Sequence, residues 1–450
     1  MSKKIRPLLV LLAAAGLLTA AIFSNNPAAA QRPQPSGAVV ASAGARNAAI
    51  VATTADVLKA TSEIRELPIL HPVKSGAQSR IQIESMVIRN LDEETTAAGM
   101  HAIEQMMKKL GLAPADFQYR NFLIKLLSEQ VAGYYDPKRQ EFFLADWIDL
   151  EGQKPVMAHE LTHALQDQHF NLRRFDHWPR GDSDAELAAH ALIEGDATLA
   201  MKIYMTRNPM VAFAFIRSFG SNLMPSEQLK QAPRSLRESL VFPYEAGLEW
   251  TTALYKKGGW AAVSQAFKDL PQSTEQILHP DKYFTHEAPV KVGLPDVRAQ
   301  LGSKWKRIDY DVSGEWSYYL ILDQFLNSES ESKRAAAGWA GDRYELYEGA
   351  GAGDLFLAQM SVWDTETDAR EFFDAYARRI TLRYANPKAA EVTSSSTPST
   401  TNRRQWNTGE GGVVIELHGK WVLIIEGVPE NASAEQLTKA LWQSVQNPER

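Results

Sequence analysis

The sequence has 450 residues, of which 44% are apolar and 23% charged, and this is the composition of a soluble globular protein rather than a disordered one. A chain of this length exceeds what a single hydrophobic core usually serves, so we expect at least two domains. The formal net charge of -6 argues against a nucleic-acid-binding protein. The absence of cysteine excludes disulfides and thiolate ligands, so any metal must be held by His, Asp or Glu.

The amino terminus has the features of an export signal. Basic residues within the first six positions precede an apolar stretch over Leu8–Phe23, and three alanines precede Gln31. The stretch is about 16 residues long, shorter than the roughly 20 that span a bilayer. We therefore expect a cleaved signal peptide over residues 1–30 and an exported protein, periplasmic or secreted, without stable membrane insertion. If the signal were not cleaved, it would anchor the protein in the membrane.

The next segments differ in composition. Ala-, Gly- and Ser-rich sequence predicts a flexible leader over residues 31–54, after which apolar residues recur at helical spacing. Two aromatic-rich runs, Gly133–Tyr135 and Glu141–Leu144, flank a turn that contains Pro137 and predict a β-hairpin. An edge of this hairpin would let an extended substrate pair with it as an added strand.

Two long helices are predicted after the hairpin. The first begins near Pro155, because proline is favoured at the first helical position, and ends near Gln168. The second begins at Ser183, which forms a capping box with Glu186, and ends near Met205. Shorter helices are predicted over 244–256, 259–268 and 313–327.

The composition changes again near residues 338–341. Beyond this point, strands are predicted over 344–347, 355–362, 413–417 and 421–427, with helices over 367–384 and from 434 onward. A Ser/Thr/Pro-rich loop occupies 393–401. We therefore expect an α+β fold, with a mostly helical domain and a small sheet over 55–339, followed by a separate α+β domain of unknown role over 340–450.

Residues 159–163 are HELTH, an HExxH motif within the first long helix. Residues four apart lie on one face of a helix, so His159 and His163 can both direct a ring nitrogen to one zinc ion. Glu160 lies about 100° around the helix from His159. From there it can act as the general base on a water that the zinc ion has acidified.

A catalytic zinc ion usually has three protein ligands and one open position. The best candidate for the third ligand is Glu194, because a carboxylate within an otherwise apolar helical stretch is costly unless it is paired or metal-bound. The adjacent Gly195 would allow two helices to approach closely. A structural salt bridge from Glu194 is the alternative. His190 and Glu186 lie on roughly the same face and are weaker candidates.

The HELTH segment and the helical glutamate resemble the gluzincin zinc peptidases, in which two helices present His, His and Glu. The runs HELTHALQDQHF and ALIEGDA are also similar to a family of uncharacterised bacterial exported proteins regarded as metallopeptidases, and the resemblance extends over about 55–345, including GYYDP and STEQILHP. It implies a zincin-like fold, one Zn²⁺ bound by His159, His163 and Glu194, catalysis by Glu160, and a peptide or protein substrate.

The sequence departs from related patterns at two positions. Metzincins have a glycine that bends a third histidine back to the metal, but this chain has Gln166 there, and on a continuous helix His169 would face away from His163. Many gluzincins have an Asp four residues after the glutamate to orient a histidine ligand, but this chain has Thr198. Asp167, Asp196 or a backbone carbonyl remain candidates for that orienting role.

A donor for the developing oxyanion is also needed. His279 is the first candidate and Tyr283 and Tyr244 are weaker ones, although each is also explained as an ordinary packed side chain. Two other functions remain open. The first is a non-catalytic envelope protein in which zinc is a structural brace, with a fourth ligand from His169 or His190. The second is a zinc amidase that acts on non-peptide amides by the same mechanism.

Overall fold

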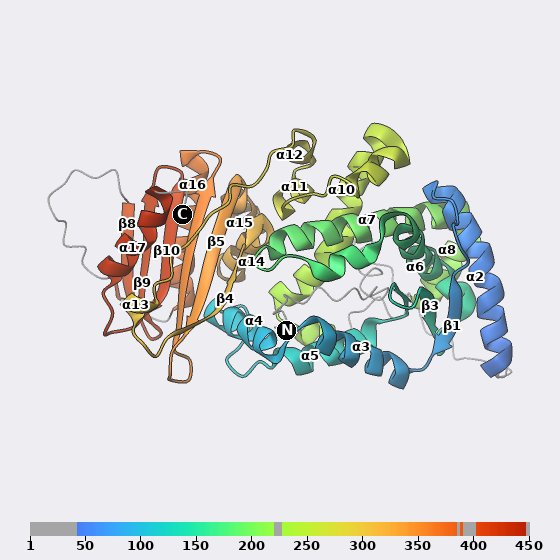
Figure 1. Cartoon of the computed structure of the whole chain (residues 1–450), viewed down its shortest axis with the longest axis horizontal. Coiled ribbons are helices and arrows are strands. Elements are labelled where there is room, and N and C mark those ends of the chain that lie inside the picture. The colour runs from blue at the N-terminus through green and yellow to red at the C-terminus, as the bar shows by residue number, and fades with distance from the viewer. Residues whose placement is uncertain (1–42, 220–226, 385–387, 390–401, 447–450) are drawn as a thin grey trace.

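The computed structural model describes residues 43–219, 227–384, 388–389 and 402–446, and these form a mixed α+β protein dominated by helices (Figure 1). The α+β fold expected from the sequence is confirmed. A helical body with a three-stranded sheet lies at one end of the molecule, and a seven-stranded sheet with its own helices lies at the other. The predicted signal peptide over 1–30 and the loop over 393–401 lie outside the described residues.

The first described element is helix α2 (Ala43–Arg65), so the prediction of a flexible leader is wrong from Ala43 to residue 54. The alanines that resemble linker composition are also the strongest helix formers. The helix is held by tertiary contacts. Ile50 is fully buried, and the guanidinium of Arg46 donates to the carbonyl oxygen of Ile148 at 2.5 Å.

The small sheet contains the predicted hairpin, which is confirmed. Strands β2 (Gly133–Asp136) and β3 (Glu141–Ala145) pair antiparallel, while β1 (Lys74–Gln78) pairs parallel to the other side of β3. The strand order is β1-β3-β2, so β2 is an edge strand. The parallel β1 was not predicted.

The helical body surrounds this sheet (Figure 1). Its remaining helices are α3 (Arg80–Glu94), α4 (Ala97–Lys109), α5 (Tyr119–Gln130), α6 (Leu150–Phe170), the 3-10 helix η1 (Leu172–His177), α7 (Ser183–Arg207), α8 (Pro209–Phe219), α9 (Glu227–Gln231), α10 (Arg234–Ala266), α11 (Thr274–Leu278) and α12 (Pro280–Phe284). The short helix α13 (Arg298–Leu301) instead lies beside the large sheet, and its Leu301 belongs to a core of that sheet.

Both predicted long helices are present, but the first begins earlier than predicted and the second has a different capping residue. Helix α6 begins at Leu150, because the carboxylate of Asp149 accepts from the Gly152 N–H and caps it there, and Pro155 lies inside the helix. Helix α7 is capped by Asp182, whose side chain accepts from the Ala185 N–H, rather than by Ser183. In both cases an aspartate immediately before the helix supplies the cap.

The large sheet has the order β4-β5-β6-β10-β9-β8-β7, with every neighbouring pair antiparallel. Its elements are β4 (Lys306–Asp311), α14 (Gly314–Leu326), α15 (Glu329–Ala336), β5 (Trp339–Glu348), β6 (Leu355–Trp363), α16 (Glu366–Arg383), β7 (Lys388–Ala389), β8 (Asn402–Thr408), β9 (Gly411–His418), β10 (Trp421–Val428) and α17 (Ala434–Gln446). The four predicted strands are confirmed as β5, β6, β9 and β10. Strand β4 precedes residue 340, where the second domain was predicted to begin, and that boundary stays a prediction.

The large sheet has a core on each face. In β10, Val422 and Ile424 belong to the core that contains residues of α14 and α16, while Leu423 and Ile425 belong to the core that contains residues of α17. This alternation follows from the two-residue repeat of a strand. None of the helices in the described part of the chain combines the length and apolarity that a membrane span requires.

Candidate metal centre

Helices α6 and α7 bring together the three side chains predicted as ligands. The Nε2 atoms of His159 and His163 lie 3.1 Å apart. The Oε2 atom of Glu194 lies 3.1 Å from Nε2 of His159 and 3.5 Å from Nε2 of His163. All three residues are buried, and their ligand atoms form one of the groups in the described residues that is compact enough to hold a metal ion.

The close crossing of α7 with α10 accounts for the position of Glu194. A Cβ atom on Gly195 would lie 2.2 Å from the carbonyl oxygen of Gly247 in α10, and one on Gly247 would lie 2.2 Å from the carbonyl oxygen of Ala191. Each helix therefore has a glycine where the other presents its backbone. The predicted role of Gly195 in close helix packing is confirmed, although its partner is α10 rather than α6.

Glu160 lies beside the three ligands and is held by the small sheet. Its Oε2 atom accepts from the backbone N–H of Tyr135 in β2 at 3.0 Å, while Oε1 is buried and has no hydrogen-bond partner among the described residues. One oxygen is thus fixed and the other is available. A cavity of about 10 Å³ adjoins it, close to the minimum that one water molecule needs, lined by Tyr134, Tyr135, Pro137, Glu160, His163, Leu172 and Glu194.

Burial and the neighbouring charges shift the pKa values of Glu160, His163 and Glu194. Burial, with the nearby charge of Glu194, raises the pKa of Glu160 to about 8. Burial alone would lower the pKa of His163, but the charge and hydrogen bond of Glu194 raise it to about 9. Burial would raise the pKa of Glu194, but the two histidines hold it well below its usual range. The glutamate is therefore a carboxylate at neutral pH, as a metal ligand must be.

Gln166 orients His163, and sequence reasoning missed it. Its Oε1 atom accepts from Nδ1 of His163 at 2.9 Å, and its Nε2 donates to Oδ2 of Asp196 and to the carbonyl oxygen of Ile193, both at 3.0 Å. Asp196 in turn forms a buried ion pair with Arg65 of α2, at 2.5 Å. Of the three predicted candidates, Asp196 therefore acts through Gln166. The three-residue spacing between His163 and Gln166 could have indicated this contact, because residues three apart lie on the same face of a helix.

Asp167, another predicted partner of a histidine ligand, instead joins the walls of the small cavity. Its Oδ2 atom accepts from the hydroxyl of Tyr135, and its Oδ1 atom accepts from the backbone N–H of Leu172, both at 2.9 Å. Asp167 thus ties β2 to the start of η1. Nδ1 of His159 has no hydrogen-bond partner among the described residues, and its ring stacks on Tyr244 with centroids 6.1 Å apart.

The weaker ligand candidates do not join the compact group. His169 faces away, as the continuous helix predicts, and its Nε2 donates to the carbonyl oxygen of Pro68 at 2.7 Å. His190 is buried and donates through Nδ1 to the carbonyl oxygen of Glu186 at 2.9 Å. The group of possible ligands contains neither of these histidines nor the Glu186 carboxylate.

Of the three residues predicted as oxyanion donors, only Tyr244 contacts a ligand, through its stacking on His159. His279, the first candidate, donates to Oε1 of Glu315 at 2.9 Å and does not line the cavity beside Glu160. The Tyr283 hydroxyl donates to the carbonyl oxygen of Asp269 at 2.8 Å. His279 and Tyr283 are thus each held by another partner, and neither lines the cavity beside Glu160.

A second compact group of carboxylates consists of Glu275, Glu287 and Asp364. The ammonium of Lys282 pairs with all three, at 2.8, 2.6 and 2.5 Å respectively. A lysine ammonium thus already contacts all three carboxylates, and we interpret the group as an ion-pair cluster that joins α11 and α12 to the end of β6.

Comparison with known proteins bears on the large sheet only. A family described as a domain of unknown function (DUF8575) matches residues 300–438, which run from α13 into α17. No curated protein and no solved structure matches the chain. The metal centre and the helical body lie outside the matched residues.

Proposed function

We propose that the protein is an exported zinc metallopeptidase of the gluzincin type with a zincin-like helical domain. The triangle formed by His159, His163 and Glu194 carries this proposal. Ions that bind nitrogen and oxygen at about 2.0–2.1 Å separate neighbouring tetrahedral ligands by about 3.4 Å. The observed separations of 3.1, 3.1 and 3.5 Å fit three corners of such a tetrahedron, with the fourth left for water or substrate.

In the proposed peptide hydrolysis, the zinc ligands and Glu160 would have separate roles. Zinc, when bound, would acidify a water molecule and polarise the substrate carbonyl. Glu160 Oε1 would accept the proton of the attacking water and pass it to the departing amine, because Oε2 is already held by the Tyr135 N–H. Burial raises the pKa of Glu160 to about 8, so its ionised form is a stronger base than an exposed carboxylate, and the positive charge of a bound zinc ion would favour that ionised form.

The small cavity beside Glu160 has room for a water molecule but not for a peptide. Substrate entry therefore requires that a wall moves, and the walls are the hairpin residues Tyr135 and Pro137 and the η1 residue Leu172. The hairpin remains our candidate for substrate pairing, because β2 is an edge strand.

The decisive experiment is a peptide-library digest with the purified protein, with and without a chelator, using Glu160→Gln as the matched variant. We expect the wild-type protein to cleave only when zinc is present, and Glu160→Gln to retain zinc without cleaving. Cleavage by Glu160→Gln would refute the assigned base. A zinc-loaded wild-type protein that cleaves no peptide would favour the structural brace or the amidase.

A further inference from the structure

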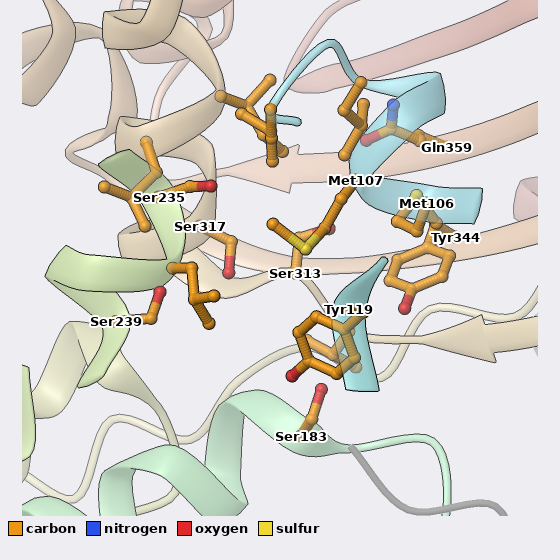
Figure 2. Close-up of a pocket in the computed structure, with 16 residues that line it drawn as sticks. Met106, Met107, Tyr119, Ser183, Ser235, Ser239, Ser313, Ser317, Tyr344 and Gln359 are labelled. Carbon is orange, nitrogen blue, oxygen red and sulfur yellow. The ribbon is translucent and has the colours of Figure 1, made fainter. Parts of the chain in front are cut away.

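A cavity of about 230 Å³ lies where the helical body meets the large sheet, and none of the residues of the HExxH motif lines it (Figure 2). Helices α4, α5 and α10 and the start of α7 contribute walls from the helical body, while α14, β5 and β6 contribute walls from the other side. Its lining residues are Met106, Met107, Leu110, Leu112, Tyr119, Ser183, Ser235, Leu236, Ser239, Val312, Ser313, Ser317, Leu320, Ile321, Tyr344 and Gln359.

The lining is apolar with neutral polar groups. Among the described residues that line the cavity, none is Asp, Glu, Lys or Arg. A charged ligand would therefore lose its hydration without an ion pair in return, which is strongly unfavourable. The lining selects for a neutral molecule.

Two serine side chains of α10, Ser235 and Ser239, contribute hydroxyl groups to one wall of the cavity. Figure 2 shows Ser235 and Ser239 on α10 opposite Met106 and Met107 of α4, with the Ser235 hydroxyl directed into the cavity. The Ser235 side chain is 7% exposed, and its Oγ has no hydrogen-bond partner among the described residues. A buried hydroxyl without a partner costs free energy, so a partner supplied by a ligand would be favourable.

Tyr119 adds a second polar group to the same space. Burial alone raises the pKa of its hydroxyl, and no hydrogen bond contributes to the shift. By contrast, the other lining tyrosine, Tyr344, donates its hydroxyl to Asp309 at 3.0 Å. The Ser235 hydroxyl therefore remains for a molecule within the cavity, and Tyr119 lines the same space.

We propose that this cavity is a binding site for a neutral, mostly apolar small molecule that carries one hydrogen-bonding group. A cavity of about 150 Å³ holds benzene, so 230 Å³ corresponds to roughly nine non-hydrogen atoms. The lining residues Met106, Leu112 and Ser317 are half-buried. Because walls come from both parts of the molecule, an occupant would stabilise their association.

The probe for the test is 4-ethylphenol, with 4-methylbenzoate as its anionic counterpart, and binding to the full chain is measured by calorimetry and by the rise in unfolding temperature. We expect saturable binding of 4-ethylphenol and at least tenfold weaker binding of 4-methylbenzoate. Absence of saturable 4-ethylphenol binding, or equal affinity for the anion, would overturn the proposal and indicate a hydrated space.

Variants locate the site. Ser317→Phe adds a ring at a half-buried lining position and should reduce the affinity more than tenfold, while Ser85→Phe, at an exposed position on α3, should leave it unchanged. Ser235→Ala removes one hydrogen bond and should weaken binding about three- to tenfold. If Ser235→Ala bound 4-ethylphenol as tightly as the wild type, the assigned contact would be contradicted. If Ser317→Phe does not fold, the affinity of Ser235→Ala alone tests the location of the site. Binding should be equal with and without zinc, so the result is independent of the peptidase proposal.

Discussion

At the scale of single residues, an amide rather than a carboxylate holds the ring of His163. Gln166 holds Nδ1 of His163, and Asp196 and Arg65 hold Gln166. An amide keeps its orientation only when both of its ends are bound, and here the Nε2 end has two acceptors. The relay therefore reaches the candidate metal centre from Arg65 at the end of α2, a helix whose first part was predicted to be a flexible leader.

Replacing Gln166 with Ala should raise the dissociation constant for zinc about 10- to 100-fold, because loss of a group that orients a histidine ligand typically has this effect. The measurement is competition with a chelator of known affinity. Gln168→Ala is the matched control, since Gln168 lies on the same helix but bonds to the backbone of Leu70 and His71. Equal zinc affinities in the two variants would exclude the relay.

Replacing Glu194 with Ala should abolish stoichiometric zinc binding, because the two histidines would then lack the only carboxylate in their group. Metal analysis of the purified variant measures this directly. Retention of one zinc ion per chain would transfer the third position to another group, such as His190, whose Nε2 has no partner among the described residues.

The sequence specified the residue-scale site unevenly. The four-residue spacing placed His159 and His163 together, and the apolar surroundings of Glu194 identified it although it lies more than a helix away. Sequence reasoning missed Gln166 because a neutral amide within a helix is ordinary, whereas a charge in an apolar stretch is costly and therefore indicates a role. His279 was a poor candidate because nothing in its sequence context fixed where it lies relative to α6.

At the scale of elements, the contact between α7 and α10 depends on two glycines. Gly195→Ala should lower the free energy of unfolding by about 1–3 kcal/mol, because the new methyl group overlaps the Gly247 backbone. This loss must exceed the gain of about 1 kcal/mol that alanine usually brings to a helix. The variant should also bind zinc more weakly, since Glu194 is the adjacent residue.

Urea unfolding and chelator competition together test this expectation. Gly409→Ala is a suitable control, because a Cβ atom there meets no atom within 4 Å. A Gly195→Ala protein that is more stable than the wild type would show that the helices separate without cost.

Elements with local signals were predicted, and those that depend on distant partners were not. The hairpin of β2 and β3 follows from its aromatic runs and turn. Strand β1 does not, because its sequence KSGAQ has no apolar alternation and its pairing with β3 crosses more than 60 residues. Similarly, α2 has no clear apolar face, and its helical state depends on packing against the body.

At the scale of the whole molecule, buried charges join the helical body to the large sheet. Glu426 of β10 is fully buried and pairs with Arg379 at 2.9 Å and Arg383 at 3.0 Å, both from α16. Arg379 also donates to the carbonyl oxygen of Leu110 at the end of α4, at 2.7 Å. The buried ammonium of Lys109 contributes to the same field. One carboxylate therefore balances cations from both parts of the molecule.

Glu426→Gln should lower the free energy of unfolding at pH 7 by about 3–5 kcal/mol, because it leaves the buried Arg379 without its counter-charge. Burial would raise the pKa of Glu426, but Arg379, Arg383 and Lys109 lower it to about 2 from the ordinary value of 4.5. A carboxylate with a lowered folded-state pKa stabilises fully above the unfolded value and loses this contribution as the pH falls. The difference between wild type and variant should therefore shrink between pH 4.5 and 2.

Urea unfolding at a series of pH values measures that difference. Glu410→Gln is the matched control, because Glu410 pairs with the same Arg383 but its side chain is 46% exposed, so its removal should cost no more than about 1 kcal/mol. If the loss in Glu426→Gln stayed constant from pH 4.5 to 2, the carboxylate would not be the group that balances these cations. If instead it follows the predicted window, acid should weaken the large sheet and its contact with α4 together, because Arg379 bonds to both Glu426 and Leu110.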